Sequence, residues 1–172
     1  AQGEALSGRR PFVKYWVHTG MLNVGNVKMS KSLGNVVRIR DALASYTKEE
    51  LRLFFANTHY RKVANFSKSR LLNARRELES IRETVRQLRS CSSEKPAGKL
   101  DLRLLRDVSR IEADFIAAMD DDFDTARAVR VLTRFLDTAK RKVRSRRFAS
   151  STCEAAVNRI LALSGVIGIP AD

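Results

Sequence analysis

The sequence predicts a mostly α-helical protein in which a short strand-containing region precedes an antiparallel helical bundle. From residue 67 onward, four segments space their apolar residues three and four positions apart and are joined by short connections. Narrow apolar stripes of this kind pack helices into antiparallel bundles. Before residue 38 the chain carries instead short aromatic and β-branched runs, which are typical of strands. We therefore divide the chain into a region 1–66 and a helical domain 67–172.

Composition narrows the class of partner. Of 172 residues, 44% are hydrophobic, which is enough to bury a core and excludes wholesale disorder. The chain has 33 Lys and Arg against 19 Asp and Glu, a net charge of +14, which indicates a polyanionic partner. No apolar run approaches the ~18 residues of a membrane span, so nucleic acid is favoured over membrane. Two cysteines make no disulfide framework, which suits a reducing intracellular compartment, the cytoplasm or an organelle matrix.

The first region should contain strands and short helices. Residues 12–17 and 21–24 read as two strands, the second ending at the turn pair Gly25-Asn26. Two short strands are marginal alone, so we expect further members of their sheet elsewhere. The pattern is helical from Arg38, and a capping box at 47–50 is followed by an apolar face of Leu51, Phe54 and Phe55.

Four longer helices should follow. Ser67 is the expected N-cap of the first, with apolar residues at 71, 74, 78, 81, 85 and 88. Residues 91–98 form a loop, and the second helix carries Leu104, Val108, Ile111, Phe115 and Met119. Asp124 or Thr125 caps the third, whose stripe is Val129, Leu132, Leu136, Ala139 and Val143. The last runs from about 152 to 163 and ends at Ser164-Gly165.

Positive charge is concentrated in two blocks. Residues 38–90 carry thirteen bases and six acids, and residues 127–159 carry ten bases and two acids, with an acidic stretch between them. Residues 140–147 hold six bases in eight positions. Such a run is either a solvated helix end, where cations favour the dipole, or a phosphate-binding surface.

Residues 28–35 are the strongest candidate for chemistry. Lys28 and Lys31 are three positions apart, with Ser30, Ser32 and Gly34 beside them. Two ammonium groups can meet a triphosphate from two sides while hydroxyls and backbone N–H groups complete its contacts. A lysine-serine loop taken alone can equally be a solvated turn.

The residues of this loop, Lys28-Met29-Ser30-Lys31-Ser32, resemble the KMSKS element of class I aminoacyl-tRNA synthetases letter for letter. The surroundings are similar to cysteinyl-tRNA synthetases over nearly the whole chain. The segments that carry this resemblance are 15–20, 33–35, 51–52, 57–61, 65–67 and 119–125.

The resemblance implies an activity and the roles of several residues. In that family the loop closes over ATP, bound with Mg²⁺, while cysteinyl-adenylate forms, and its lysines stabilise charge on the pyrophosphate. By motif match, Lys31 and Lys28 would be the catalytic lysines. The ATP-binding residues would be Lys28, Met29, Ser30, Lys31, Ser32, His18 and Gly20. From the concentration of positive charge, rather than from the resemblance, we expect RNA contacts at Arg61, Lys62, Lys140, Arg141, Lys142, Arg144, Arg146 and Arg147.

Two elements of the family are not found in this sequence. There is no His-Ile-Gly-His element, since the histidines are His18 and His59. Cys91 and Cys153 do not match the family's zinc ligands, so we expect no metal site in this chain and a zinc site in a missing N-terminal half. A doubly wound nucleotide fold needs both halves of its sheet, so this chain alone should be catalytically incomplete.

Three functions remain open. The first is the C-terminal portion of a cysteine–tRNA ligase, with the missing half and tRNA(Cys) as partners. The second is a synthetase-derived, non-catalytic RNA-binding subunit of a ribonucleoprotein such as an organellar ribosome, which the high charge favours. The third is a related ligase that joins cysteine to an amino sugar, and the basic bundle argues against it.

Overall fold

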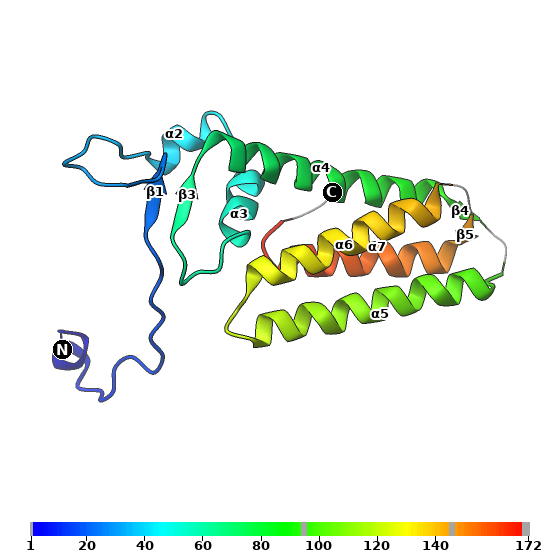
Figure 1. Ribbon diagram of the computed structural model, residues 1–172. Coiled ribbons are helices and arrows are strands. Elements are labelled where there is room, and N and C mark those ends of the chain that lie inside the picture. Colours follow the sequence, from blue (N-terminus) through cyan, green and yellow to red (C-terminus); the bar gives the residue numbers. More distant parts are fainter. Residues whose placement is uncertain (1, 94–95, 145–146, 170–172) are drawn as a thin grey trace.

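The protein has a small sheet at one end and a helical bundle at the other (Figure 1). The structure is a computed structural model and describes residues 2–93, 96–144 and 147–169. The expected mostly helical class, with a short strand-containing region before the bundle, is confirmed. Within the described residues, no helix is long and apolar enough to cross a lipid bilayer.

The sheet has three short strands, β1 (Leu22–Val24), β2 (Val27–Lys28) and β3 (Ala64–Phe66), in the order β2-β1-β3. β1 pairs antiparallel with β2 across a two-residue turn. Gly25 (φ 58°) and Asn26 (φ 67°) both have the positive φ that such a hairpin turn requires, which confirms the predicted turn pair. β3 pairs parallel with β1 and was not predicted, because three residues carry too little pattern to reveal a distant partner.

The predicted strand at 12–17 is wrong. Those residues form neither strand nor helix, and Tyr15 and Trp16 are 77% and 74% exposed. A strand needs a neighbour to take up its backbone N–H and C=O groups, and no described segment lies in that position. The chain before it forms a short helix, α1 (Gln2–Ser7), which reaches away from the rest of the molecule (Figure 1).

Two helices follow the hairpin, α2 (Ile39–Leu43) and α3 (Lys48–Ala56). The capping box predicted at the start of α3 is present. The N–H of Glu50 donates to Thr47 Oγ1 (3.2 Å), and the N–H of Thr47 donates to Glu50 Oε2 (2.9 Å). Arg75 Nε donates to Glu50 Oε1 (2.5 Å), so the same carboxylate also fixes α3 to the next helix.

α3 turns a different face to the core than the sequence suggested. Leu53 and Phe54 are buried, whereas Phe55, expected in the apolar face, is 49% exposed. The two buried residues belong to the same hydrophobic cluster as the bundle, so α3 closes one end of that core.

The bundle consists of α4 (Lys68–Ser90), α5 (Lys99–Asp120), α6 (Thr125–Val143) and α7 (Ser150–Val166), which alternate in direction (Figure 1). α6 and α7 each pack against both α4 and α5, so α4 and α5 lie diagonally opposite. The predicted stripes are confirmed. The largest fully buried side chains of these helices are Leu71, Leu78, Leu88, Leu104, Phe115, Leu132, Leu136 and Ile160.

The ends of the bundle helices agree with the sequence in position but not always in detail. Ser67 is the N-cap of α4, yet its side chain makes no capping hydrogen bond. Asp124 caps α6 as predicted, accepting from the N–H of Arg127 (2.8 Å). α7 extends from residue 150 to 166, two to three residues beyond the predicted range at either end.

The far end of the bundle is held by a two-stranded parallel pairing of β4 (Ser92–Ser93) with β5 (Phe148–Ala149). A loop was predicted for the region that contains β4. Beside this pairing, the buried carboxylate of Asp101 accepts from the N–H of Gly98 (2.8 Å) and from the N–H of Ala149 (2.8 Å). One side chain therefore satisfies backbone donors at the starts of both α5 and α7.

Candidate phosphate-binding loop and nucleic-acid interface

The lysine-serine loop, residues 28–35, leaves the sheet at the end of the β1–β2 hairpin. The hairpin continues one step beyond β2, where the N–H of Met29 donates to the carbonyl of Leu22 (3.0 Å). The loop therefore starts from a fixed backbone position, and it projects from the end of the molecule opposite the bundle (Figure 1).

Asn35 closes the loop at its base. Its Oδ1 accepts from the N–H of Ser30 (2.9 Å), and its Nδ2 donates to the carbonyl of Lys28 (3.1 Å). Inside this closure, the N–H of Gly34 donates to the carbonyl of Lys31 (3.1 Å), and Gly34 has the positive φ (66°) that this tight turn requires. Asn35 is not among the site residues predicted from the sequence. The sequence feature that could have indicated this role is an Asn directly after the loop glycine, because the side-chain amide of Asn in a turn can form hydrogen bonds with nearby backbone groups.

Both lysines of the loop face solvent. Lys28 and Lys31 are exposed, and within the described ranges neither ammonium group has a carboxylate partner. Ser30 Oγ and Ser32 Oγ lie 3.2 Å apart, so the two hydroxyls share one side of the loop. Met29 is half-buried and anchors the start of the loop. Two free cations and a hydroxyl pair on a closed loop are suited to a phosphate group.

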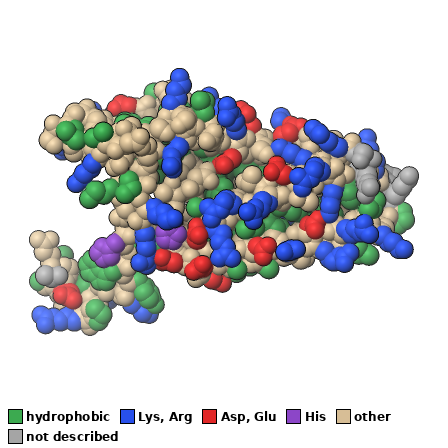
Figure 2. Space-filling view, in the orientation of Figure 1, with side chains coloured by type: hydrophobic (Ala, Val, Ile, Leu, Met, Phe, Trp, Pro, Cys, Tyr) green, Lys and Arg blue, Asp and Glu red, His purple; other side chains and the backbone are tan. Residues whose placement is uncertain are grey.

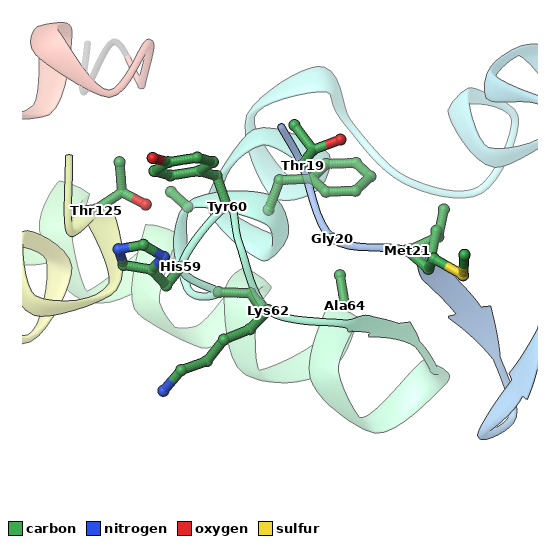
Figure 3. Close-up of a pocket in the computed structure, with 12 residues that line it drawn as sticks. Thr19, Gly20, Met21, His59, Tyr60, Lys62, Ala64 and Thr125 are labelled. Carbon is green, nitrogen blue, oxygen red and sulfur yellow. The ribbon is translucent and has the colours of Figure 1, made fainter. Parts of the chain in front are cut away.

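His18 and Gly20, predicted beside the nucleotide, lie in different surroundings. The exposed His18 ring stacks on Trp16, with ring centroids 6.4 Å apart. Gly20 lines a cavity of about 420 Å³ (Figure 3). Its N–H donates to the carbonyl of Tyr60 (2.6 Å), and a Cβ on Gly20 would lie 2.2 Å from the carbonyl oxygen of Lys62. Glycine is therefore required here by the close approach of two backbones.

The cavity lies between the sheet region and the bundle. Figure 3 shows His59 directed toward Thr125 at the start of α6, with Tyr60 above it and Lys62 on the strand-side segment. Its lining is mainly apolar and includes no residue of the lysine-serine loop. The structure thus brings Gly20 and Lys62 to one cavity but leaves Lys28 and Lys31 outside it.

An ionic cluster joins this cavity wall to the turn between α5 and α6. Tyr60 Oη donates to Asp122 Oδ1 (2.5 Å), and Arg61 Nε lies 2.8 Å from Asp122 Oδ2. These hydrogen bonds, first from the Tyr60 hydroxyl and then from the Arg61 guanidinium, hold the pKa of Asp122 below its usual value. Asp122 (φ 55°) and Phe123 (φ 52°) both adopt left-handed backbone conformations, which aim the carboxylate back at the cluster. Arg61, predicted to contact RNA, is therefore held by a protein partner.

The basic run 140–147 does not form a single surface. Lys140 Nζ donates to Ser80 Oγ on α4 (2.7 Å), while Lys142 pairs with Asp107 on α5. Arg141 donates to Thr138 on its own helix (3.1 Å) and, like Arg144, is exposed.

Arg147, which follows in the run, lies at the end of the bundle beside β5. Arg147 donates to the carbonyl of Ser90, and Arg146 lies outside the described residues. Lys140, Lys142 and Arg147 thus bond to other helices, while Arg141 and Arg144 face solvent.

No metal centre is found in the part of the chain that the structure describes: no three His, Cys, Asp or Glu side chains are grouped as ligands. Cys91 and Cys153 are buried with their Sγ atoms 3.5 Å apart. Burial, and next the contact with Cys91, raises the pKa of the Cys153 thiol to about 12. Among the described residues, this pair has no further His, Cys, Asp or Glu grouped with it, as a zinc site requires.

Two family models match parts of this chain. Residues 1–76 match the family described as tRNA synthetases class I (C) catalytic domain, and residues 114–171 match the DALR domain. A cysteine–tRNA ligase of Bacillus cytotoxicus is 35% identical over 170 residues, which cover 98% of this chain and 36% of the relative. A cysteine–tRNA ligase of Oenococcus oeni is 38% identical over the same shares of the two chains. The chain thus spans about a third of the length of these relatives.

One solved structure has the same fold. A chain of the Agrobacterium radiobacter K84 agnB2 LeuRS-tRNA-LeuAMS ternary complex superposes with a TM-score of 0.68 over 86% of this chain and 20% of that chain, at 19% identity. At this identity the likeness concerns the fold alone. Over 98% of its length the chain is thus similar to part of the cysteine–tRNA ligases, and its two domain matches are to a class I tRNA synthetase catalytic domain and to a DALR domain.

Proposed function

We propose that this chain is the C-terminal portion of a cysteine–tRNA ligase, supplying the ATP-phosphate loop and the RNA-contacting bundle. The observation that carries the proposal is the lysine-serine loop, which Asn35 closes and in which Lys28 and Lys31 are exposed, with no carboxylate partner among the described residues. The two Asn35 hydrogen bonds hold both lysines on one closed loop, whereas a solvated turn does not require such a fixed arrangement of two cations. The proposed division of labour falls near residue 66.

The loop would act on the phosphates of ATP. When the carboxylate of cysteine attacks the α-phosphorus, negative charge grows on the departing pyrophosphate. Lys31, with Lys28 as its partner, would stabilise that charge, and the protein would have no covalent role. Ser30 and Ser32 hydroxyls, with backbone N–H groups, would complete the phosphate contacts. His18 and Gly20 would lie farther along the nucleotide, and Mg²⁺ would accompany ATP as part of the substrate.

The rest of the active site would come from the part of the protein outside this chain. The relatives are nearly three times as long, and exposed apolar side chains gather on the sheet region rather than on the bundle. These side chains are Phe12, Tyr15, Trp16, Val17, Met21, Val27, Leu33, Val36, Ile39, Leu43, Phe55 and Val63. We propose that this apolar surface packs against an N-terminal half that holds the second ATP element and the zinc site for cysteine.

The experiment is a split-enzyme assay. This chain is mixed with the N-terminal two thirds of the Bacillus cytotoxicus relative, and cysteine-dependent ATP–pyrophosphate exchange is measured. Lys31→Ala should lower turnover roughly 100-fold, the loss typical of one transition-state donor, with little change in the KM for cysteine. Lys99→Ala, an exposed lysine at the start of α5, is the matched control. Unchanged turnover in the Lys31 variant would overturn the catalytic role of the loop.

A second function is favoured by the charge of the bundle. Residues 127–159 carry ten bases and two acids, a net charge of +8. We propose as the alternative a non-catalytic, synthetase-derived RNA-binding subunit of a ribonucleoprotein. It predicts steeply salt-dependent binding to structured RNA and no exchange activity with any N-terminal partner. Restored exchange activity in the split assay would contradict it.

A further inference from the structure

We infer that the outer face of α6 is an RNA-backbone binding surface, separate from the ATP-phosphate loop. Its members, here named the arginine ridge, are Arg127, Arg130, Arg134, Arg141 and Arg144. The inference deepens the proposed function, on which its choice of RNA rests, by assigning the contact to one helix face. The described residues of the basic run 140–147, by contrast, are directed to different sides of the bundle: Lys140 to α4, Lys142 to α5, and Arg141 and Arg144 to solvent.

The ridge follows from helix geometry. At about 100° per residue, Arg127, Arg130, Arg134 and Arg141 fall within about 60° of the circumference of α6, and the C-cap Arg144 widens this sector to about 100°. Leu132, Leu136 and Ala139, all buried, lie on the opposite side. Lys140 and Lys142 point to the flanks, where they bond to α4 and α5. The packing of α6 between two neighbours therefore fixes which basic residues face outward.

The ridge is long, straight and rich in unpaired charge. From Arg127 to Arg144 it spans seventeen rises of about 1.5 Å, or about 25 Å. Arg127 pairs with Asp121 (3.3 Å), but Arg130, Arg134 and Arg144 have no carboxylate partner among the described residues. Lys and Arg side chains are spread along the bundle face that contains α6 (Figure 2).

The chemistry of the ridge favours a phosphate backbone over other anionic partners. All five residues are arginine, whose planar guanidinium binds phosphate in a bidentate manner. No apolar residue interrupts the ridge, so it has no means of inserting into a lipid surface. One exposed acid, Asp137, lies on the same face between Arg134 and Arg141, so the ridge carries five cations and one anion. Guanidinium groups along one helix face suit the phosphates of an RNA strand, and such contacts read shape rather than sequence.

The ridge is also distant from the ATP-phosphate loop. The loop lies at one end of the molecule and α6 belongs to the bundle at the other end (Figure 1). Binding at the ridge therefore needs neither ATP nor the remainder of the active site, and this chain alone is a sufficient test object.

The test is fluorescence anisotropy with a labelled RNA duplex of random sequence, titrated at several salt concentrations. The variant Arg130→Gln/Arg134→Gln/Arg144→Gln should bind at least tenfold more weakly at low salt. The slope of log K against log salt should fall by about 2 to 3, close to one unit for each lost phosphate contact.

The matched control removes the same charge from the opposite end of the molecule. Arg9→Gln/Arg10→Gln/Lys14→Gln lowers the net charge by three as well, at exposed positions of the N-terminal segment. It should keep the affinity and the salt slope of the unaltered chain. Circular dichroism checks that both triple variants retain their helices.

The outcomes separate the ridge from the wider proposal. Equal losses in both variants, or no loss in the ridge variant, would overturn the ridge, while retained RNA binding leaves the proposed function intact. If the unaltered chain binds neither the duplex nor a cysteine tRNA transcript, both the ridge and the RNA-binding part of the proposed function are wrong. Tighter binding to anionic phospholipid vesicles or to polyglutamate, lost in the ridge variant, would overturn RNA as the partner.

Discussion

Asn35 should control how often the lysine-serine loop opens. The change Asn35→Ala removes two hydrogen bonds, from the N–H of Ser30 and to the carbonyl of Lys28. Each is worth about 1 kcal/mol net, so the closed loop should lose about 2 kcal/mol relative to open forms. Since 1.4 kcal/mol is a factor of ten, the open population should rise about 30-fold.

Limited proteolysis measures that population directly. Trypsin cleaves after lysine only where the chain can open locally, so cleavage after Lys28 and Lys31 should follow the open fraction. Mass spectrometry of the early fragments should show these two bonds cut about 30-fold faster in Asn35→Ala. Asn35→Asp keeps an acceptor for Ser30 and loses the donor, so it should fall between the two proteins.

The control is Asn73→Ala, an exposed asparagine on α4 that should leave cleavage in the loop unchanged. Equal cleavage rates at Lys28 and Lys31 in the unaltered chain and in Asn35→Ala would refute the idea that the Asn35 hydrogen bonds hold the loop closed. An equal acceleration in the Asn73 variant would show that the effect is global rather than local.

Three further predictions concern the scaffold. Gly20→Ala should lower the melting temperature, because the new Cβ would lie 2.2 Å from a backbone carbonyl oxygen, whereas Gly165→Ala, with open space around it, should not. Burial opposes the charge on Asp101, but two backbone N–H donors outweigh it and hold the pKa of the carboxyl below its usual value. The stability contributed by the Asp101 carboxylate is therefore fully present above the pKa of this group in the unfolded chain. It is lost as the pH falls through the lower pKa of the folded state. Asp101→Ala should cost about 2–4 kcal/mol in urea unfolding at pH 7, and this difference from the unaltered chain should shrink on acidification; a pH-independent difference would argue against it. With the pKa of the Cys153 thiol raised to about 12, Cys91 and Cys153 should resist Ellman's reagent at pH 8 until guanidinium unfolds the chain, and fast reaction of the folded protein would contradict that burial.

The sequence predicted those elements whose signal is local and repeated. The stripe of α4 at 71, 74, 78, 81, 85 and 88 is buried throughout, because a 3.6-residue period repeated over five turns leaves one solution. The capping box of Thr47 and Glu50 is equally local and was found at its predicted place. β3 was missed and residues 12–17 were assigned wrongly for one reason. Strand formation depends on a partner that lies elsewhere in the chain, and the run at 12–17 has none among the described residues.

The candidate site was predictable in composition but not in arrangement. The motif named Lys28 and Lys31 without indicating that Asn35 holds the loop closed, since that contact depends on the path of the turn. Likewise a count of charges in 140–147 could not show that Lys140 and Lys142 turn sideways into neighbouring helices. Which cations face outward is decided by helix packing, and packing is a tertiary property.

β3 and α4 have a mechanical consequence for the whole molecule. β3 ends at Phe66 and α4 starts at Lys68, with the single residue Ser67 between them. β3 is also hydrogen-bonded to β1, whose hairpin carries the lysine-serine loop. α4, about 34 Å long, thus connects the sheet to the far end of the bundle as one rigid element. If the bundle tilts relative to the sheet, either the lysine-serine loop moves with it or the pairing of Asn23 with Asn65 breaks. The orientation of the bundle and the position of the loop are therefore coupled.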